Sequence, residues 1–314
     1  MEVIGIGDLH LSGINGRSGI SKYKSNSDEY ILSEVQRVVD QGEAIEHVLL
    51  YGDICDSPRM SYLAHQLLTS FFIKNKDRQF HIILGNHDKL AKTQGNSLEL
   101  LPLFKLKNVH IYEKPTVVDI GMKINFLSYP YNEFKKNCLN VCHLDINGAN
   151  DGKRKIVSDN IDNGCTIVSG HIHNFCEFKK VHYSGTLFPM NFGDSNKKYF
   201  HIIENYGNEF EVTNVPFKPK LILKTLRVKK GEKPELDDNI IYRLICEDPS
   251  PEFIKPNVYR VIASEDVDYL DDITFEYLDL NTENIFNKLI ENMDNKDDLI
   301  RVRQECLYGV RNKR

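Results

Sequence analysis

Short apolar runs alternate with helical patterns along the first 84 residues of the chain. Residues 3–7, 47–51 and 80–84 are apolar runs, which predicts three buried strands. Between the first two, residues 28–40 repeat apolar side chains at helical spacing, and Gly42 follows as a stop signal, so a helix is predicted there. Strands and helices in this alternation indicate an α/β fold in which helices cover the faces of a sheet.

A second helix is predicted after Ser57, which has the position of an N-cap and is followed by Pro58 in the first helical position. Apolar side chains then recur three and four residues apart, as on one face of a helix. These side chains are Met60, Leu63, Ala64, Leu67, Leu68, Phe71 and Phe72.

From residue 109 onward the pattern becomes rich in short strands separated by turn residues. The predicted strands are 109–112, 116–120, 123–129, 139–143, 166–169, 181–184, 199–204 and 210–215. Such a run predicts a second sheet packed on the first.

Two prolines within residues 215–220 predict a boundary, because proline cannot continue a central strand. The predicted domains are therefore 1–217 and a smaller unit at 218–280, followed by a terminal segment at 281–314. The smaller unit has predicted strands at 225–228, 240–246, 259–263 and 274–278, and two helices with apolar stripes are predicted at 285–293 and 299–310.

The composition is average for a globular protein, with 41% hydrophobic and 27% charged residues, which excludes a disordered chain or a coiled-coil rod. The net charge is −5, so any attraction to nucleic acid must come from local patches, bound metal ions or a partner. The seven cysteines include no C-x-x-C pair, and the chain has no signal-peptide pattern and no apolar run of ~18 residues. These features predict a cytoplasmic protein (in the host cytoplasm if viral) without a membrane span.

Five polar clusters carry the candidate chemistry, and four of them directly follow a predicted strand. They are Gly7-Asp8-Leu9-His10, Gly52-Asp53-Ile54-Cys55-Asp56, Gly85-Asn86-His87-Asp88, Cys142-His143 and Gly170-His171-Ile172-His173. Loops at strand ends build the sites of open α/β sheets. Because side chains two apart in an extended segment point the same way, Asp8 with His10 and His171 with His173 can each present two ligands together. Carboxylate, imidazole and amide ligands favour manganese, iron or zinc over calcium.

In this order, D-x-H, G-D-x-x-D, G-N-H-D, a solitary histidine and G-H-x-H resemble the signature of the calcineurin-like metallophosphoesterases, over about the first 200 residues. Within that superfamily the chain is similar to the SbcD-type DNA repair exonuclease subunits, the phage recombination endonuclease subunits among them. Gly-Asp-Ile-Cys-Asp, the aspartate of Gly-Asn-His-Asp and Tyr-Ser-Gly-Thr (183–186) favour this narrower match. The resemblance implies a two-sheet sandwich flanked by helices, then a small α/β capping domain (218–280) and terminal helices.

The resemblance also implies two divalent metal ions that share Asp53. One ion would be held by Asp8, His10, Asp53 and His173, and the other by Asp53, Asn86, His143 and His171. Manganese is the first expectation for the metal, and iron, zinc or magnesium are the alternatives. A carboxylate in the shared position agrees with elementary chemistry, because two cations ~3.5–4 Å apart repel each other unless an anion bridges them.

Three more side chains receive roles around these ligands. The resemblance assigns His87 as the proton donor to the leaving oxygen, with Asp88 expected to hydrogen-bond its imidazole and orient it. Asp56 is interpreted as a residue that orients the metal loop without being a ligand. An ordinary carboxylate near the start of a helix is almost as good an interpretation of Asp56.

The resemblance implies a homodimer within a heterotetramer, with an SbcC-type SMC-like ATPase as the second subunit. Helices in 281–314 would bind that ATPase, or else pack on the capping domain. A polar loop holds the best candidates for contact with a DNA backbone, although a solvated charge is the more frequent case for each. These candidates are Lys153, Arg154 and Lys155.

The sequence thus predicts a two-metal nuclease that hydrolyses phosphodiester bonds in single- or double-stranded DNA, including its ends, during recombination, repair and replication. Three alternatives remain. The chain could be a phosphoesterase of the same fold that acts on nucleotides or phosphoproteins, a non-catalytic scaffold, or a protein that binds DNA ends without cutting them.

Overall fold

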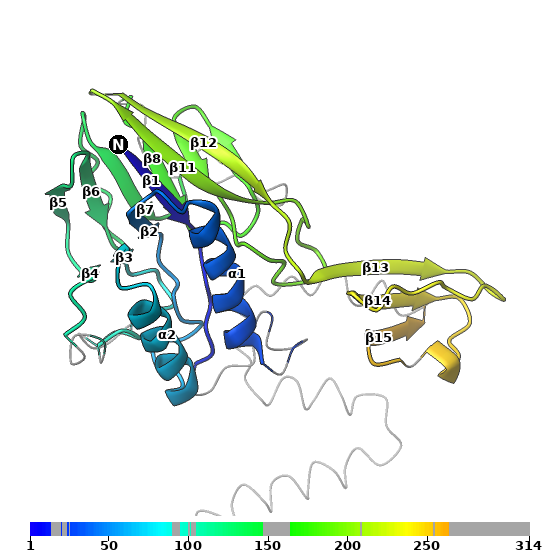
Figure 1. The fold of residues 1–314 in the computed structure, drawn as a ribbon. Helices are drawn as coiled ribbons and strands as arrows, with labels where there is room; N and C mark the ends of the chain where they lie inside the picture. Colours follow the sequence, from blue (N-terminus) through cyan, green and yellow to red (C-terminus); the bar gives the residue numbers. More distant parts are fainter. Residues whose placement is uncertain are drawn as a thin grey trace, which may run out of the picture. The chain divides into compact units, whose positions relative to one another are not determined.

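The structure is a computed structural model that describes residues 1–13, 20, 24, 26–89, 95–99, 101, 105–146, 164–207, 209–253 and 255–263 (Figure 1). The chain divides into a unit at Met1–Val261 and a unit at Ile262–Arg314. Apart from residues 262 and 263, the second unit lies outside the described residues. The predicted strand 274–278 and both predicted terminal helices therefore remain predictions.

Six strands form the first sheet, in the order β12-β11-β1-β2-β3-β4. They are β1 (Glu2–Ile6), β2 (His47–Leu50), β3 (Gln79–Ile83), β4 (Val109–Tyr112), β11 (Lys198–Tyr206) and β12 (Glu209–Phe217). Neighbours from β1 to β4 run parallel, whereas β11 pairs antiparallel with β1, and β12 pairs antiparallel with β11. Parallel neighbours need long crossovers. The first two crossovers contain α1 (Ser27–Gln41) and α2 (Tyr62–Lys74), close to the predicted helices.

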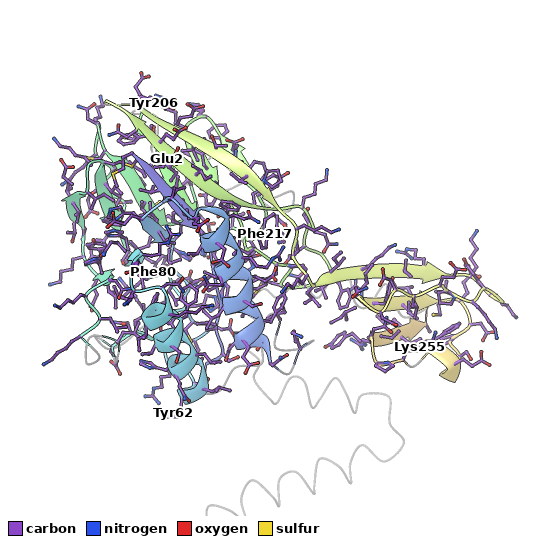
Figure 2. All side chains as sticks on the ribbon, in the orientation of Figure 1. Glu2, Tyr62, Phe80, Tyr206, Phe217 and Lys255 are labelled. Atoms are coloured by element: carbon purple, nitrogen blue, oxygen red, sulfur yellow. The ribbon has the colours of Figure 1, made fainter. Side chains whose placement is uncertain are left out.

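Both helices cover the same face of this sheet, and Figure 1 shows them side by side. The buried stripe of α1 includes Val35 and Val38, which join one apolar cluster with Phe72 of α2. Phe80 of β3, labelled in Figure 2, meets Phe72 with ring centroids 4.9 Å apart. Packing on this face therefore holds β2 and β3, and the loops that follow them, on a rigid support.

Six further strands form the second sheet, in the order β5-β6-β7-β8-β10-β9. They are β5 (Thr116–Asp119), β6 (Lys123–Leu127), β7 (Leu139–His143), β8 (Ile167–Gly170), β9 (Cys176–Phe178) and β10 (Val181–Tyr183). The inner faces of the two sheets share one buried cluster, in which Leu49 and Ile83 of the first sheet join Phe126 and Val141 of the second. The predicted α/β fold with two packed sheets is confirmed. The strand-rich run from residue 109 does not form the second sheet alone, because β4, β11 and β12 belong to the first sheet.

Two local predictions were wrong, and one strand was missed. The N-cap of α2 is Ser61, whose hydroxyl accepts the Ala64 amide at 3.1 Å, whereas the hydroxyl of Ser57 donates to the Arg59 carbonyl. Leu63, predicted on the buried face, is 56% exposed, because it lies in the first turn of α2 at the margin of the buried stripe that includes Ala64 and Leu68. The three-residue strand β9 was not predicted, since it is too short to show a period.

A third sheet, in the order β13-β14-β15, follows the proline-containing segment 215–220. Its strands are β13 (Ile222–Val228), β14 (Ile240–Cys246) and β15 (Val258–Ala263), with a 3-10 turn at Pro251–Phe253. Three predicted strands are thereby confirmed. Pro216 is part of β12 and is tolerated there because β12 is an edge strand. Within the described residues no helix is long and apolar enough to cross a membrane.

Candidate metal centre

The polar clusters meet where parallel strands of the two sheets end. Asp8, Asp53 and Asn86 follow β1, β2 and β3 of the first sheet, while His143 ends β7 and His171 follows β8 of the second. Strands β1, β2 and β3 are parallel neighbours, as are β7 and β8. Their carboxyl ends therefore share one edge in each sheet, where open α/β sheets place their sites.

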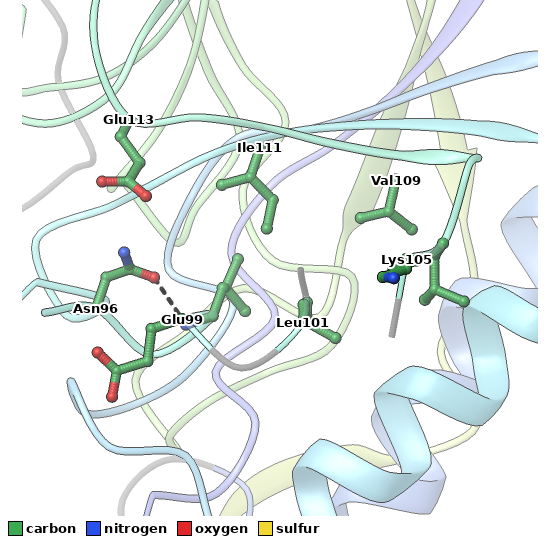
Figure 3. Close-up of a pocket in the computed structure, with 9 residues that line it drawn as sticks. Asn96, Glu99, Leu101, Lys105, Val109, Ile111 and Glu113 are labelled. Atoms are coloured by element: carbon green, nitrogen blue, oxygen red, sulfur yellow. Dashed lines mark hydrogen bonds between the residues drawn. The ribbon is translucent and has the colours of Figure 1, made fainter. Parts of the chain in front are cut away.

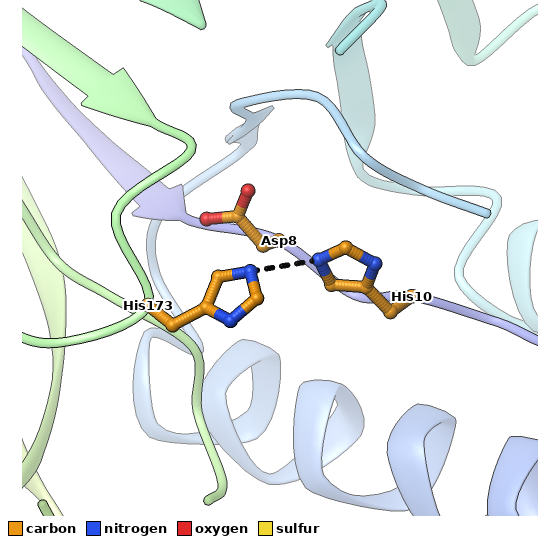
Figure 4. A group of neighbouring side chains, drawn as sticks. All are labelled: Asp8, His10 and His173. Carbon is orange, nitrogen blue, oxygen red and sulfur yellow. Dashed lines mark hydrogen bonds between the residues drawn. The ribbon is translucent and has the colours of Figure 1, made fainter. Parts of the chain in front are cut away.

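Asp8, His10 and His173 form the first ligand group (Figure 4). Each offers one ligand atom, and these atoms all lie within 4.8 Å of one another. The Nε2 atoms of His10 and His173 are 3.1 Å apart and face each other. Side chains from the loops after β1 and β8 thus point at a common position. Asp8 and His10 present ligands together, as the D-x-H spacing predicts. His171 and His173 do not, because His171 has a φ of 87°, outside the extended conformation that the prediction assumed, and faces a second group.

Asp53, His143 and His171 form the second ligand group, with their ligand atoms again within 4.8 Å of one another. The Nε2 of His143 is 3.2 Å from the Oδ2 of Asp53. The side-chain oxygen of Asn86 completes this group, since it lies 3.1 Å from Nε2 of His143 and 2.9 Å from Nδ1 of His171. The structure brings together all four residues of the expected second set.

Asp53 lies between the two groups. Its Oδ2 is 3.8 Å from Nε2 of His10 in the first group and 3.2 Å from Nε2 of His143 in the second. Its other oxygen accepts the backbone amide of His87 at 2.9 Å, which fixes the rotation of the carboxylate. One buried carboxylate therefore faces both groups, the position that a bridging ligand requires.

The side-chain oxygen and nitrogen atoms of these groups are arranged as ligands of divalent cations and not as hydrogen-bonded polar groups of a protein core. Oδ2 of Asp8 is buried and has no hydrogen-bond partner among the described residues. The facing Nε2 atoms of His10 and His173 can share only one proton between them, whereas a cation accepts a lone pair from each. Buried carboxylates and imidazoles at this density need positive charge between them, and two cations would supply it.

Charge coupling among these groups perturbs their pKa values strongly. Burial alone would lower the pKa of His143, but the carboxylates of Asp53 and Asp8 outweigh it and raise that pKa to about 9. Burial alone would raise the pKa of Asp53, yet His143 and His10 hold it well below its usual range. Burial and the neighbouring His10 lower the pKa of His173 to about 3. A proton on His143 thus offsets the carboxylate charge until a cation displaces it.

Three of the ligands have strained backbones. His10, Asp53 and His171 have φ angles of 53°, 47° and 87°, in the left-handed region that costs a residue other than glycine about 1–3 kcal/mol. Such strain persists only where the surrounding structure imposes it, and it is frequent at functional sites. The turns that aim these three side chains inward are therefore made at the ligands themselves.

The sequence profile of the calcineurin-like phosphoesterases matches residues 1–189 of the chain. This stretch is more than half of the chain and contains every candidate ligand described above. The chain belongs to the calcineurin-like phosphoesterase family.

Among known proteins, this phosphoesterase is similar to Exonuclease subunit 1 of Enterobacteria phage T4, with 26% identity over 225 residues. The alignment covers 62% of this chain and 62% of that protein, so the chain matches less than two thirds of its relative's length. Two solved structures are also similar, each at 12% identity. Nuclease MPE of Pseudomonas putida has a TM-score of 0.35 over 63% of this chain and 83% of its own. A purple acid phosphatase from yellow lupin (Lupinus luteus) seeds has 0.41 over 68% and 51%. The assignment rests on the sequence profile, because both TM-scores are below 0.5.

The glycines of the phosphoesterase motifs serve two different purposes. Gly52 has a φ of 89°, which requires glycine. Gly85 and Gly170 are needed instead for close approach. A Cβ on Gly85 would lie 2.0 Å from Oδ1 of Asp53, and one on Gly170 would lie 2.7 Å from Nδ1 of His143. Of these three glycines, Gly52 alone has a φ in the left-handed region.

The expected contact between Asp88 and the imidazole of His87 was wrong. The fully buried Asp88 carboxylate accepts the amides of Ile54, Cys55 and Gly85 at 2.9 to 3.1 Å, as well as the Ser97 hydroxyl at 2.7 Å. Asp88 thereby ties the loop after β2 to the loop after β3.

His87 is oriented by a different group. Its Nδ1 donates to the backbone carbonyl of Asp56 at 3.0 Å, and its ring lies edge-on to His10 with centroids 5.1 Å apart. Oδ1 of Asp56 lies 3.3 Å from Nδ1 of His10, a contact that suits a residue orienting a ligand without being one.

Sequence reasoning missed three groups that support the ligands. Asp145 lies 3.4 Å from Nε2 of His171, and its H-x-D spacing from His143 is a signal that could have identified it. The carbonyl of Tyr51 accepts Nδ1–H of His143 at 2.7 Å, which leaves Nε2 free to be a ligand. The buried ammonium of Lys198 donates to the carbonyl of His173 at 3.4 Å, and no local motif marks it.

A separate cavity of about 350 Å³ lies beside β4 (Figure 3). Its described lining includes none of the candidate ligands, so it is not the metal centre. Its lining residues are Asn96, Leu98, Glu99, Leu101, Lys105, Leu106, Val109, Ile111 and Glu113.

The candidate DNA contacts lie outside the described residues, so the expectation for them remains untested. They are Lys153, Arg154 and Lys155.

Proposed function

We propose that this phosphoesterase is a nuclease that uses two divalent metal ions, manganese first among them, to hydrolyse phosphodiester bonds in DNA. The observation that supports the proposal most strongly is the position of Asp53 between two ligand groups, 3.8 Å from Nε2 of His10 and 3.2 Å from Nε2 of His143. A paired arrangement of this kind suits in-line attack on phosphorus.

When bound, the two ions would supply Lewis acidity that activates a water and offsets the charge developing on the phosphoryl oxygens. The chain's own residues supply position. Asp53, held by the His87 amide, keeps the two groups side by side, and Asp56 and the Tyr51 carbonyl fix the rings of His10 and His143. His87, with Nδ1 donating to the Asp56 carbonyl, can present Nε2 to the leaving oxygen and hold the proton that this oxygen takes.

DNA is the proposed substrate because the phage relative is described as an exonuclease subunit and because the narrower sequence motifs favour that branch of the family. The main alternative, a phosphoesterase acting on nucleotides or phosphoproteins, would use the same ligands. The test compares end-labelled single- and double-stranded DNA, a nucleotide, bis(4-nitrophenyl) phosphate and a phosphopeptide, each with manganese and with chelator. Hydrolysis of the small substrates without DNA cleavage would exclude the nuclease, and no hydrolysis with manganese bound would favour a scaffold or an end-binding protein.

The word subunit in the relative's description supports a further proposal, that the chain assembles with an SMC-like ATPase and is itself a homodimer. The segment 281–314 is the proposed docking element for the ATPase. Deleting it should abolish ATPase pull-down and preserve manganese-dependent cleavage of single strands. Retained pull-down would reject this role for the segment, and light scattering of the full chain would test the dimer.

A further inference from the structure

A tyrosine and a lysine lie beside the second ligand group without belonging to it. Tyr129 follows β6 closely, and β6 pairs in parallel with β7, the strand that ends at His143. The amide of Tyr129 donates to the carbonyl of Leu84 at 2.8 Å, two residues before Asn86. Because neighbouring strands lie about 4.8 Å apart, Tyr129 is held next to the two loops that deliver His143 and Asn86.

The side chains here are available for a ligand. Tyr129 is 37% exposed, and no ring or cation among the described residues packs on its ring. The ammonium of Lys89 donates to the backbone carbonyl of Tyr129 and lies 5.3 Å from the ring centroid of Tyr131. Tyr131 packs against the buried apolar cluster that contains Leu127, so its ring is held in place and can position Lys89. An ammonium has three donors, so this contact leaves donors of Lys89 for a phosphate.

A lone exposed tyrosine is ordinary. A partly exposed ring without an aromatic or cationic neighbour among the described residues, together with a positioned ammonium near the candidate metal centre, forms a more informative combination. Nucleic-acid strands present a base face and a phosphate at each nucleotide, and proteins that bind single strands combine aromatic platforms with positive charge. The chain has a net charge of −5, so a local positive group of this kind would add to the attraction that bound metal ions exert on a polyanionic substrate.

We propose that Tyr129 and Lys89 form a nucleotide subsite, in which the base beside the scissile phosphodiester stacks on Tyr129 and an adjacent phosphate binds Lys89. This inference rests on the proposed nuclease function, and it specifies which form of DNA the enzyme would prefer. A base can stack on the ring only when it is free of its own neighbours, so the subsite selects single strands or frayed ends over intact duplex.

The test measures kcat/KM on a labelled single-stranded oligonucleotide and on bis(4-nitrophenyl) phosphate, which has no neighbouring nucleotide, both with manganese. Tyr129→Ala and Lys89→Gln should each lower the ratio of the two kcat/KM values about tenfold, through the KM of the oligonucleotide. Tyr129→Phe should keep the wild-type ratio, because stacking needs the ring and not the hydroxyl. An unchanged ratio in Tyr129→Ala, or an equal fall on both substrates, would overturn the subsite.

Matched controls come from the opposite end of the same sheets. Tyr206 is 59% exposed at the end of β11, beyond the start of antiparallel β1, and Lys123 begins β6. Tyr206→Ala and Lys123→Gln remove the same chemical groups far along their strands from the metal centre, and both should leave the ratio at its wild-type value. A tenfold fall in either control would mean that general charge or surface aromatic content, and not this subsite, controls the preference.

Direct binding separates failure of the subsite from failure of the nuclease proposal. Fluorescence anisotropy with the labelled oligonucleotide in calcium needs no cleavage. If the wild type cuts no DNA but binds the oligonucleotide about tenfold more tightly than Tyr129→Ala does, the subsite stands while the nuclease proposal falls. If both bind equally, or if the wild type does not bind, the subsite is refuted whatever the enzyme cleaves.

Discussion

Gly85→Ala is the sharpest perturbation that the structure offers, because it adds one methyl group against the carboxylate between the two ligand groups. The added Cβ would lie 2.0 Å from Oδ1 and 2.4 Å from the backbone nitrogen of Asp53. Gly85 does not have a φ in the left-handed region, so the substitution imposes crowding without backbone strain.

The size of the effect follows from these distances. Ordinary contacts begin at 3.4 Å, so Asp53 or the loop at 85–88 must move. A displacement of roughly 1 Å at a reacting centre can lower a rate about 10²-fold. Overpacking of this kind also lowers the free energy of unfolding by about 1–3 kcal/mol. We therefore expect a folded variant with weaker manganese binding and about 1% of the wild-type phosphodiesterase rate.

The assay combines calorimetric manganese titration, hydrolysis of bis(4-nitrophenyl) phosphate and urea unfolding. Gly207→Ala is the control, because Gly207 has a φ of 73° with nothing within 4 Å of an added Cβ. That variant should lose about 1–2 kcal/mol of stability through backbone strain and keep its metal affinity and rate. A Gly85→Ala protein that binds manganese and turns over as the wild type does would refute the placement of Asp53 as the shared ligand.

Three further predictions concern single groups around the centre. His87→Ala should lower kcat about 10²–10⁴-fold while metal content, measured by atomic emission, stays near wild type, and loss of metal would reassign His87 as a ligand. The pKa of about 9 at His143 lies above its unfolded value, so its contribution to the stability of the metal-free protein is complete below about pH 6.5 and is lost as the pH rises through 9. Manganese affinity should accordingly rise over that window, and a calorimetric titration showing no proton release at pH 7.5 would contradict this. Asp88→Asn should destabilise the fold by about 3–5 kcal/mol in urea unfolding, because an amide nitrogen would face buried donors, and an unchanged midpoint would refute the tie between the two loops.

The hydrophobic pattern was sufficient to predict most strands and helices. Both sheets bury one face in a common cluster, and this burial imposes the spacing of apolar residues from which strands are predicted. The hydrophobic pattern did not predict the start of α2 or the short strand β9, because these depend on hydrogen bonds and strand pairing and not on apolar spacing. The sequence favours Ser57 as the N-cap because Pro58 follows it, yet the N-cap is Ser61, whose backbone amide donates to the Ser12 carbonyl at 2.9 Å, a contact that the local sequence does not show. Strand β9 has three residues and owes its existence to pairing with β10.

The position of the clusters at strand ends was predictable, because parallel strands of one sheet end at one edge. The division of the ligands into two groups that share Asp53 came from the resemblance to the phosphoesterases. The roles of the supporting groups were not predictable in the same way. Asp88 follows His87 directly, yet its carboxylate faces backbone amides across the loop while His87 turns to the Asp56 carbonyl. Hydrogen bonds to backbone carbonyls, such as that from Nδ1 of His143 to the Tyr51 carbonyl, cannot be predicted from residue types, because every residue has a carbonyl.

The ligands are divided between the two sheets, with Asp8, Asp53 and Asn86 from one and His143 and His171 from the other. Ions held there would link the two sheets, which are otherwise joined by their shared apolar cluster and by a few hydrogen bonds such as that from His143 to the Tyr51 carbonyl. Metal supply and folding would then be linked, because a ligand bound only by the native state stabilises it in proportion to the logarithm of its concentration. A cell short of the metal would lose the structural integrity of the protein together with its chemistry, so metal availability would govern how much of the protein survives as well as how fast it works.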